Sequence, residues 1–476
     1  TAPCESIKIE KAFTPSDKAF TFKVNGSSET SFQPTKLIVN YEAGEIEYMG
    51  YVTFPQRPAG TTAPFVTSIT VELLGQDNTP AFDLDRNNDG SFTVNSLSSW
   101  CGTDNNADLA KIYRDEARFC RALSYWHALD MFGNVPFVTE NDKVGSTLPK
   151  QTDRATLFAY IEGELLAIEN TLKDPKTNEY GRADKAAAWM LLANLYLNAE
   201  VYTGTAKNTE AATYAKKVMD VTGYSLETKY ANLFLADNHK SNEIIFAVNF
   251  DGNNTRTYGG TTFLVHAAVG GSMSAAAYGV DGGWGGLRTT TGLSSKFPDL
   301  TGTADKRSQF YTTGQSADIS DLTKFTDGYA ITKFRNINMN GTPGKNLTWV
   351  DIDFPIFRSA EMNLVYAEAV LRGGTGDAGT ALTYVNALRT RAGASTITAS
   401  QLNLDFILDE RARELYWEGF RRTDLIRYNR FVESSYLWPW KGGVRGGTNV
   451  DAFRRLYPIP SADISSNPNL VQNAGY

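Results

Sequence analysis

Two patterns of apolar and polar residues divide the chain near residue 97. Before that point, short β-branched or aromatic runs are separated by Gly, Pro, Asn and Ser, which is typical of strands joined by turns. These runs are residues 19–24, 36–42, 44–54 and 65–74. From Asp108 onward the apolar residues recur at helical spacing. The pattern predicts a β-rich N-terminal region, 1–97, and a mainly α domain, 98–476.

The first helical segment, "EARFCRALSYWHALDMFGNVPFVTE" (116–140), carries apolar residues on more than one face. Such a helix must be covered on several sides. Its helical pattern stops at the Gly-Asn-Val-Pro sequence of 133–136. Cys120 lies among the apolar residues and is interpreted as a small buried side chain.

The following segments predict helices that pack in antiparallel pairs. Thr152 or Asp153 is placed to cap a helix over 151–172. Residues 184–202 and 208–220 read as a pair joined by a short polar link. Small residues stand where the two helices would approach closely, namely Ala186, Ala187, Ala193 and Ala211. This layout is typical of tetratricopeptide-type repeats, although any helical hairpin would also produce it.

Residues 245–350 interrupt the helices with a Gly-, Ser- and Thr-rich stretch that contains isolated aromatic residues. Long irregular segments within a compact domain are usually functional. Helical patterns return at 354–374, 378–394 and 404–428, and a turn-rich tail closes the chain at 457–476.

Composition excludes several classes of function. No apolar run reaches the roughly 18 residues of a membrane-spanning helix. The net charge of −7, with no basic block, argues against nucleic acid as a partner. Three His and three Cys supply a zinc site or a Ser-His-Asp triad poorly, and they do not make a disulfide scaffold.

Four segments together resemble the SusD/RagB family of Bacteroidetes outer-membrane lipoproteins, and they follow one another in the same order as in that family. They are residues 116–140, 354–374, 408–428 and 457–476. The resemblance implies four tetratricopeptide-like helix pairs that support an irregular, ligand-facing half. It also implies a lipid-anchored protein on the extracellular face of the outer membrane. Such a protein would act as a lid on a TonB-dependent SusC-like transporter, capturing oligosaccharide or, in some members, peptide.

The N-terminus is where the chain departs from the family pattern. The family begins with a helix soon after the lipid-bearing Cys, whereas this chain has strand patterns there. Cys4 is the candidate for lipid attachment, and a plain surface thiol is the alternative. The membrane would then be contacted only through that lipid.

Glu410, Glu414 and Glu418 recur every four residues in the "LDERARELYWEGFRRTDLIRY" segment. Catalytic carboxylates of a glycosidase face each other across a cleft, whereas these lie one turn apart among arginines. We therefore expect a structural ion network, with partners at helical spacing. The expected members are Arg413, Arg421, Arg422 and Asp424.

Two tryptophans are candidate ligand-binding residues because they lie outside the helical motifs, among Gly or polar residues. A ring can cover the apolar face of a sugar while polar side chains bind its hydroxyls. Trp284 stands between glycines, with Tyr278, Asp281 and Arg288 nearby. In the family, a Trp just ahead of the first of the four segments helps to form the binding surface. Trp100 falls at that place, with Asp104 and Asn105 beside it.

The two candidate clusters are expected to line one shallow site. The alternative for Trp284 is that its ring folds back as a buried loop anchor. Trp438 and Trp440, in the "YLWPW" sequence, are either a second aromatic platform or packing for the tail.

The sequence "DRNNDGSF" (85–92) resembles the first half of an EF-hand calcium loop. The ligands would be Asp85, Asn87, Asp89 and the Ser91 carbonyl, and Gly90 would make the turn. The closing position is Ser96 and not Glu, so an Asx-rich turn without metal is the alternative.

The leading hypothesis is a non-catalytic, cell-surface glycan-binding lipoprotein. A peptide-capturing member of the same family, a glycoside hydrolase and a protein-binding scaffold are the alternatives. A hydrolase needs two facing carboxylates, and no such pair can be named. A scaffold does not need tryptophans in Gly-rich loops.

The calcium hypothesis predicts that excess chelator lowers the melting temperature of the purified protein, because a ligand that binds only the native state stabilises it. Differential scanning calorimetry with and without chelator measures the change. An unchanged melting curve would identify the segment as an Asx turn.

Overall fold

The structure is a computed structural model of the 476-residue chain. It describes residues 6–12, 38–40, 47–53, 68–72, 91–95, 104–142, 145, 148–221 and 223–476, with side chains from residue 110 onward. The chain forms two compact units, Thr1–Arg114 and Asp115–Tyr476. The predicted boundary after residue 97 falls in a stretch outside the described residues.

The described residues of the first unit include five strands. β1 (Ser6–Ala12) and β2 (Ile38–Asn40) flank β3 (Glu47–Thr53) in an antiparallel sheet, and β4 (Ser68–Glu72) pairs with β5 (Ser91–Asn95). The predicted strand at 19–24 lies outside the described residues. So do Cys4 and three candidate calcium ligands, Asp85, Asn87 and Asp89, whereas Ser91 begins β5.

Helix α2 (Asp104–Phe132) contains the apolar segment that opened the helical pattern. It ends just before Gly133, whose φ of 74° suits glycine. Phe119, Trp126 and Leu129 are buried. Phe119 packs edge-on against Phe246 with ring centroids 5.1 Å apart. The helix is therefore covered by other secondary-structure elements, as the pattern requires.

Cys120 contradicts the sequence interpretation, because its side chain is exposed. Its neighbour Phe119 and the nearby Ala122 occupy the buried face of α2. Consecutive helical residues point about 100° apart, since a turn contains 3.6 residues. Cys120 therefore lies off the buried face despite its apolar neighbours in sequence.

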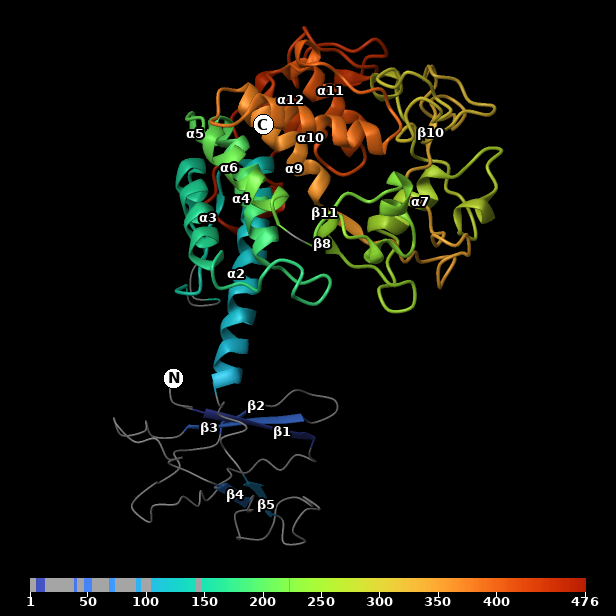
Figure 1. Ribbon diagram of the computed structural model, residues 1–476. Coiled ribbons are helices and arrows are strands. Elements are labelled where there is room, and N and C mark those ends of the chain that lie inside the picture. The colour runs from blue at the N-terminus through green and yellow to red at the C-terminus, as the bar shows by residue number, and fades with distance from the viewer. Residues whose placement is uncertain are drawn as a thin grey trace. The chain divides into compact units, whose positions relative to one another are not determined.

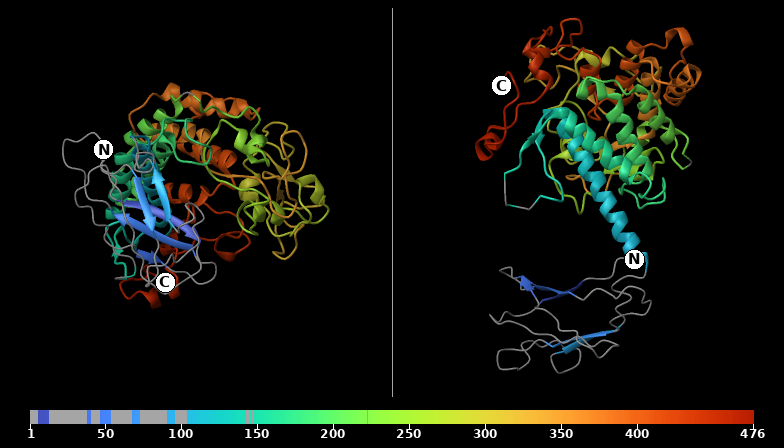
Figure 2. Two further views of the ribbon diagram at one scale, coloured as in Figure 1. Left: turned by 90° about the horizontal axis from the view of Figure 1, so that it is seen from below. Right: turned by 90° about the vertical axis from the view of Figure 1, so that its left-hand side faces the viewer.

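The helices of the second unit stack in succession, as Figures 1 and 2 show on one side of that unit. Contacts join α3 (Arg154–Ile168) to α4 (Lys185–Leu197), α4 to α6 (Asn208–Met219), and α6 to α9 (Ser359–Leu371). Helix α9 then contacts α10 (Ala378–Arg391) and α11 (Leu404–Leu415). Short helices α5 (Ala199–Thr203), α12 (Arg421–Arg427) and α13 (Ser461–Ser466) complete this half.

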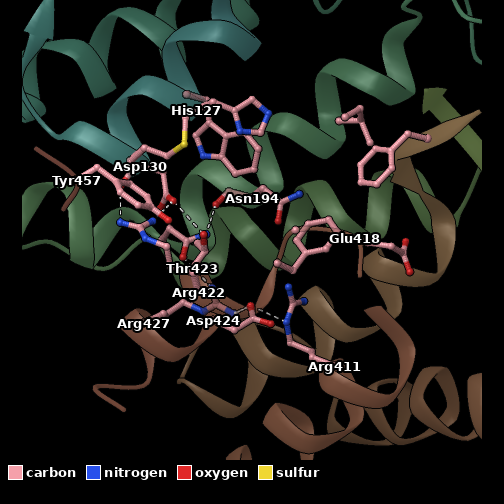
Figure 3. A pocket seen from close by; sticks show the side chains of 17 residues that line it. His127, Asp130, Asn194, Arg411, Glu418, Arg422, Thr423, Asp424, Arg427 and Tyr457 are labelled. Carbon is pink, nitrogen blue, oxygen red and sulfur yellow. Dashed lines mark hydrogen bonds and ion pairs between the residues drawn. The ribbon is translucent and has the colours of Figure 1, made fainter. Parts of the chain in front are cut away.

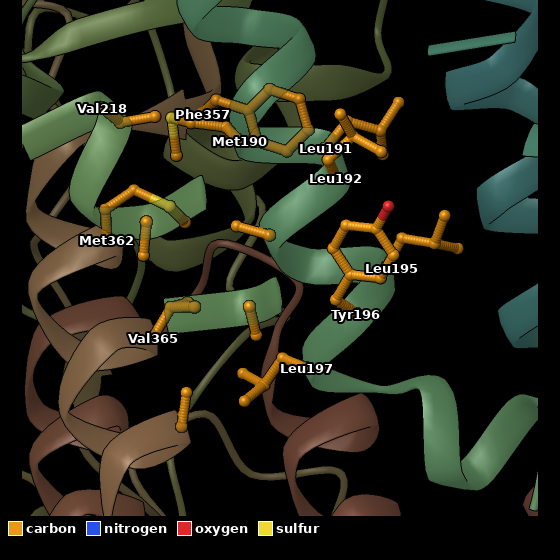
Figure 4. Packing of buried hydrophobic residues seen from close by; sticks show 14 of the residues in the cluster. Met190, Leu191, Leu192, Leu195, Tyr196, Leu197, Val218, Phe357, Met362 and Val365 are labelled. Carbon is orange, nitrogen blue, oxygen red and sulfur yellow. The ribbon is translucent and has the colours of Figure 1, made fainter. Parts of the chain in front are cut away.

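Local sequence explains the helix starts and the close packing. Asp153 caps α3 by accepting a hydrogen bond from the Thr156 N–H at 2.9 Å, and Asp184 caps α4 in the same way. The four alanines singled out in the sequence are fully buried, which lets α4 and α6 approach closely. Figure 4 shows buried core residues around these helices, among them Leu192 and Tyr196 of α4 and Val365 of α9.

The irregular half contains short elements only. They include β8 (Ile244–Val248), α7 (Gly260–Ala268), α8 (Thr291–Ser294), β9 (Phe310–Tyr311) and β10 (Ala330–Ile331). Strand β8 pairs with β11 (Phe354–Arg358), which leads directly into α9. A second small sheet, β6 (Val135–Pro136) with β7 (Gln151–Thr152), follows α2. The predicted helical stack with an irregular, loop-rich half is confirmed.

A buried ion network joins the two halves, and its centre is Glu414 on α11. Glu414 accepts hydrogen bonds from Arg358 at 2.7 Å and from Arg307 at 3.1 Å, and it also pairs with Arg391. Arg307 comes from the irregular half, whereas Arg358 and Arg391 come from β11 and α10. Glu414 therefore belongs to a structural ion network, as expected, but its partners are distant in sequence.

The partners of the network differ from those expected from helical spacing. Only Arg413 pairs with a glutamate as expected, at 2.8 Å from Glu410. Helix α11 ends at Leu415 and the backbone then turns through positive φ at Trp417 and Gly419. The three residues beyond that turn are therefore out of helical register. Arg422 pairs with Asp130, Asp424 with Arg411 and Arg427, and Arg421 with the Leu408 carbonyl.

Two glutamates of α9 have opposite electrostatic settings. Glu361 is fully buried, and its nearest guanidinium, that of Arg411, lies 3.9 Å away. Burial raises the pKa of Glu361 to about 7, an effect that Arg411 only partly offsets. Glu368 is equally buried, but Arg427 binds it at 2.6 and 2.9 Å. That pairing outweighs burial and lowers the pKa of Glu368 to about 2.

We predict that the free energy of unfolding of Glu361→Gln increasingly exceeds that of wild type as pH rises from 5 to 8. The difference should grow by up to about 3 kcal/mol. The folded pKa of Glu361 is raised. Its favourable contribution is therefore complete below about pH 4.5 and is lost as pH rises through about 7, whereas Gln stays neutral. Urea unfolding at each pH measures the difference.

Glu368→Gln is the matched control on the same helix, with the opposite sign. Glu368→Gln should be less stable than wild type at neutral pH, and this difference should shrink as pH falls toward 2. The reason is that a carboxylate with a depressed pKa stabilises the folded state while it is ionised, and this contribution is lost as pH falls through the folded pKa. Parallel pH profiles for the two variants would contradict this assignment of charge states.

Candidate functional site

Trp284 lies on a segment that is fastened to the end of helix α7. The Trp284 N–H donates to the His266 carbonyl at 2.8 Å, and the Gly285 N–H donates to the Val269 carbonyl at 2.9 Å. A Cβ on Gly283 would lie 2.3 Å from the Val269 carbonyl oxygen, so only glycine permits this close approach. The backbone is thus fixed, while 45% of the Trp284 surface remains exposed.

Four rings lie together and form what we call the aromatic surface: Tyr258, Phe263, Trp284 and Trp349. The Trp284 ring centroid lies 6.2 Å from that of Tyr258 and 6.0 Å from that of Phe263. Tyr258 in turn lies 6.1 Å from Trp349. Tyr258 and Phe263 are exposed like Trp284. Exposed aromatic clusters of this kind mark binding sites.

His266 supports the aromatic surface from beneath. Its ring is buried and stacks on Trp284, with centroids 4.8 Å apart and planes inclined by 20°. Its Nδ1 lies 2.7 Å from the Gly282 carbonyl oxygen and its Nε2 lies 3.0 Å from that of Thr348. One side chain of α7 therefore lies between the segment that carries Trp284 and the segment that carries Trp349.

Polar groups border the aromatic surface. The Arg256 guanidinium lies over the Trp349 ring, 5.1 Å from its centroid. The Asp281 carboxylate is exposed and accepts a hydrogen bond from the Thr348 hydroxyl. Rings bordered by a carboxylate and a guanidinium can cover an apolar ligand face and bind its hydroxyl groups.

The remaining predicted residues near Trp284 contact the protein itself. The Arg288 guanidinium donates to three carbonyls, those of Asp327, Gly286 and Leu322, at 2.8, 2.9 and 3.0 Å. Tyr278 is half-buried and packs against the core of the irregular half. The structure thus brings Asp281 and Trp284 to one surface and gives Arg288 the role of holding a neighbouring loop.

The second predicted cluster cannot be placed beside Trp284. Trp100 lies outside the described residues, and Asp104 and Asn105 are the first two residues of α2, without described side chains. The joint site of Trp100 and Trp284 stays a prediction.

A separate cavity of about 340 Å³ lies between α2, α4 and α12, and Figure 3 shows its walls. Its ionic groups are engaged with one another or with adjacent helices. Asp130 accepts from Arg422 at 2.7 Å and from Thr423 at 3.0 Å. Asp424 accepts from Arg411 and Arg427. Because its charged groups already have partners, this cavity is a weaker candidate than the aromatic surface.

Within the part of the chain that the structure describes, no three His, Cys, Asp or Glu side chains gather as a metal site requires. The candidate calcium loop lies outside that part. None of the described helices is long and apolar enough to cross a membrane.

Comparison with known proteins identifies relatives over most of the chain. The SusD family model matches residues 305–476. The starch-binding protein SusD of Bacteroides thetaiotaomicron is 36% identical over 417 residues, covering 76% of this chain and 72% of that protein. SusD-like protein P2 of Formosa agariphila is 26% identical over 392 residues, covering 76% and 73%.

Solved structures share the fold. Surface glycan-binding protein A from Bacteroides uniformis superimposes with a TM-score of 0.60 at 25% identity, covering 79% of this chain and 81% of that one. Surface glycan-binding protein A from Bacteroides thetaiotaomicron, in complex with laminarihexaose, has a TM-score of 0.62 at 24% identity, covering 78% and 79%.

Proposed function

This chain belongs to the SusD family, and we propose that it binds an oligosaccharide on its aromatic surface without cleaving it. The observation that carries the proposal is the exposed Trp284 ring, supported from beneath by His266 and flanked by Tyr258 and Phe263. A 36% identical relative is named for starch binding, and a protein of the same fold was solved with laminarihexaose.

The chemistry of the aromatic surface suits a sugar. A pyranose ring presents apolar C–H faces, which stack on aromatic rings, and hydroxyls at its edge, which bond to polar side chains. Asp281 accepts hydrogen bonds and Arg256 donates them, so both roles of a hydroxyl are supplied at the border. Peptide capture, the alternative within the family, has no such specific support here.

The absence of cleavage is proposed from the setting of the glutamates that a hydrolase would need. Glu410 and Glu414 are fully buried and each contacts at least two guanidinium groups. Burial alone would raise the pKa of either carboxyl group, but the surrounding arginines outweigh it and lower both pKa values. A buried carboxylate with a lowered pKa is poorly suited to act as the general acid that glycoside hydrolysis requires.

We also propose that the protein is anchored on the outer membrane by a lipid on Cys4 and covers a SusC-like TonB-dependent transporter. Family membership supports this arrangement. Mild detergent extraction from the native cells should recover the protein together with a large β-barrel transporter. Recovery of the protein alone after crosslinking before extraction would contradict the partnership.

Trp284→Ala should weaken oligosaccharide binding about 5- to 150-fold, since stacking on an aromatic platform is worth about 1–3 kcal/mol per ring. The melting temperature should change little, because 45% of the Trp284 surface is exposed and the ring lies outside the main core. Isothermal calorimetry with maltohexaose and laminarihexaose measures the affinity, and assays for new reducing ends should stay at background.

Tyr476→Ala removes an exposed ring outside the aromatic surface and is the control. Unchanged affinity of Trp284→Ala for the sugar that wild type binds would place the binding site elsewhere. Binding of a peptide panel in place of both sugars would favour the peptide alternative.

A further inference from the structure

A second open cavity, of about 470 Å³, lies between α8, α11, α12 and the segment 431–438 that includes most of the "YLWPW" sequence. Pockets that hold small ligands span about 300–1,000 Å³. Six aromatic residues line its walls: Tyr416, Trp417, Phe420, Phe431, Tyr436 and Trp438. The volume and the walls suit a single ring-shaped ligand.

Tyr416 is buried, whereas the other five aromatic side chains of this cavity are only half-buried. The Trp438 ring lies 6.1 Å from Phe431 and 6.4 Å from Tyr436, so three rings line one side. Leu437, between two of them, is exposed. These rings keep part of their faces available for stacking.

The backbone of Trp417 is held in an unfavourable conformation at the cavity. Its φ of 63° lies in the left-handed region, which bulky residues rarely adopt. Its two neighbours are fixed by the ion network: the Tyr416 carbonyl accepts from Lys333 at 2.5 Å, and Glu418 binds Arg358 at 2.6 Å. Strained backbone of this kind is concentrated at functional sites.

Positive charge exceeds negative charge around the cavity. Three cations lie within 6 Å of the Tyr436 ring centroid: Arg430 at 5.5 Å, Lys296 at 5.7 Å and Arg421 at 5.9 Å. Arg430 and Lys296 have exposed aspartates as partners. The carboxylate on the wall, Asp424, already binds two other arginines.

Arg421 differs from its neighbours because the groups it hydrogen-bonds are neutral. Its Nη1 donates to the Leu408 carbonyl and its Nη2 to the Tyr436 hydroxyl, both at 2.7 Å. Among the described side chains, no carboxylate lies within ion-pairing distance of it. A guanidinium can bind a carboxylate with two parallel hydrogen bonds, so this group can accept an anionic partner.

We propose that this cavity binds a ring-shaped molecule that carries a carboxylate, with the ring against Trp438 and the carboxylate at Arg421. A hexuronic acid residue and a small aromatic acid share this chemistry. The proposal is independent of oligosaccharide binding on the aromatic surface, because the two sites have no residue in common.

The test compares each acid with its neutral counterpart: glucuronate with glucose, and phenylacetate with phenylacetamide. All are titrated by calorimetry into full-length Trp284→Ala protein, so that binding at the aromatic surface is weakened. At least one acid should bind saturably, and its neutral counterpart should bind about 10- to 150-fold more weakly, the range for a hydrogen bond to a charged group.

Two variants locate the site. Arg421→Gln should weaken binding of the acid by a similar factor, while Arg454→Gln, an exposed arginine on another segment, should leave it unchanged. Trp438→Ala should weaken it as well. Because the comparison of acid with neutral counterpart needs neither variant, it remains decisive if Arg421→Gln fails to fold.

Binding of glucuronate alone would identify an acidic glycan as the source of the ligand, and binding of phenylacetate alone would identify a free aromatic acid. Equal affinity for acid and neutral counterpart would overturn the proposal. Lack of saturable binding by both acids, or unchanged affinity in Arg421→Gln, would overturn it too.

Discussion

One buried carboxylate, Glu414, connects parts of the second unit that are far apart in sequence. It contacts Arg358 at the start of α9, Arg391 at the end of α10 and Arg307 in the irregular half. Burial alone would raise the pKa of Glu414, but these three guanidinium groups outweigh burial and hold the pKa well below its ordinary value. Removing one member of such a buried group typically costs about 3–5 kcal/mol, because its partners are left charged and unpaired. These ion pairs thus attach the loop-rich half to the helical stack.

In the irregular half, polar side chains make hydrogen bonds to backbone groups that helices and sheets would pair with other backbone groups. A buried backbone N–H or C=O must find a partner, and loops offer few of their own. Asn336 donates to the carbonyls of Gly279 and Asn346 at 2.8 Å each. The two ring nitrogens of His266 lie beside two further carbonyl oxygens, and the Arg288 guanidinium donates to three. These side chains fix the loops that carry Trp284 and Trp349, so the aromatic surface is set before any ligand arrives, which reduces the entropy cost of binding.

The sequence predicted those features that depend on neighbours in the chain. The Asp153 cap, the buried alanines of α4 and the helical stack follow from local spacing, and the glycines around Trp284 indicated an exposed ring. Features assembled across long separations were missed. The partners of Glu414 come from positions 307, 358 and 391, so helical spacing alone misassigned the network. Tyr258, Trp349 and His266 join Trp284 only because separate loops meet on α7. The burial of Cys120 was predicted wrongly, because a helix turns by about 100° from the buried Phe119 to Cys120.

The central claim is that an oligosaccharide rests on the aromatic surface. A crystal structure of the protein grown with the oligosaccharide that it binds tests this claim most directly. The account predicts a sugar ring stacked on the exposed face of Trp284, with hydroxyls within hydrogen-bond distance of Asp281 or Arg256. Sugar density confined to another part of the molecule, with the rings of the aromatic surface free, would contradict it.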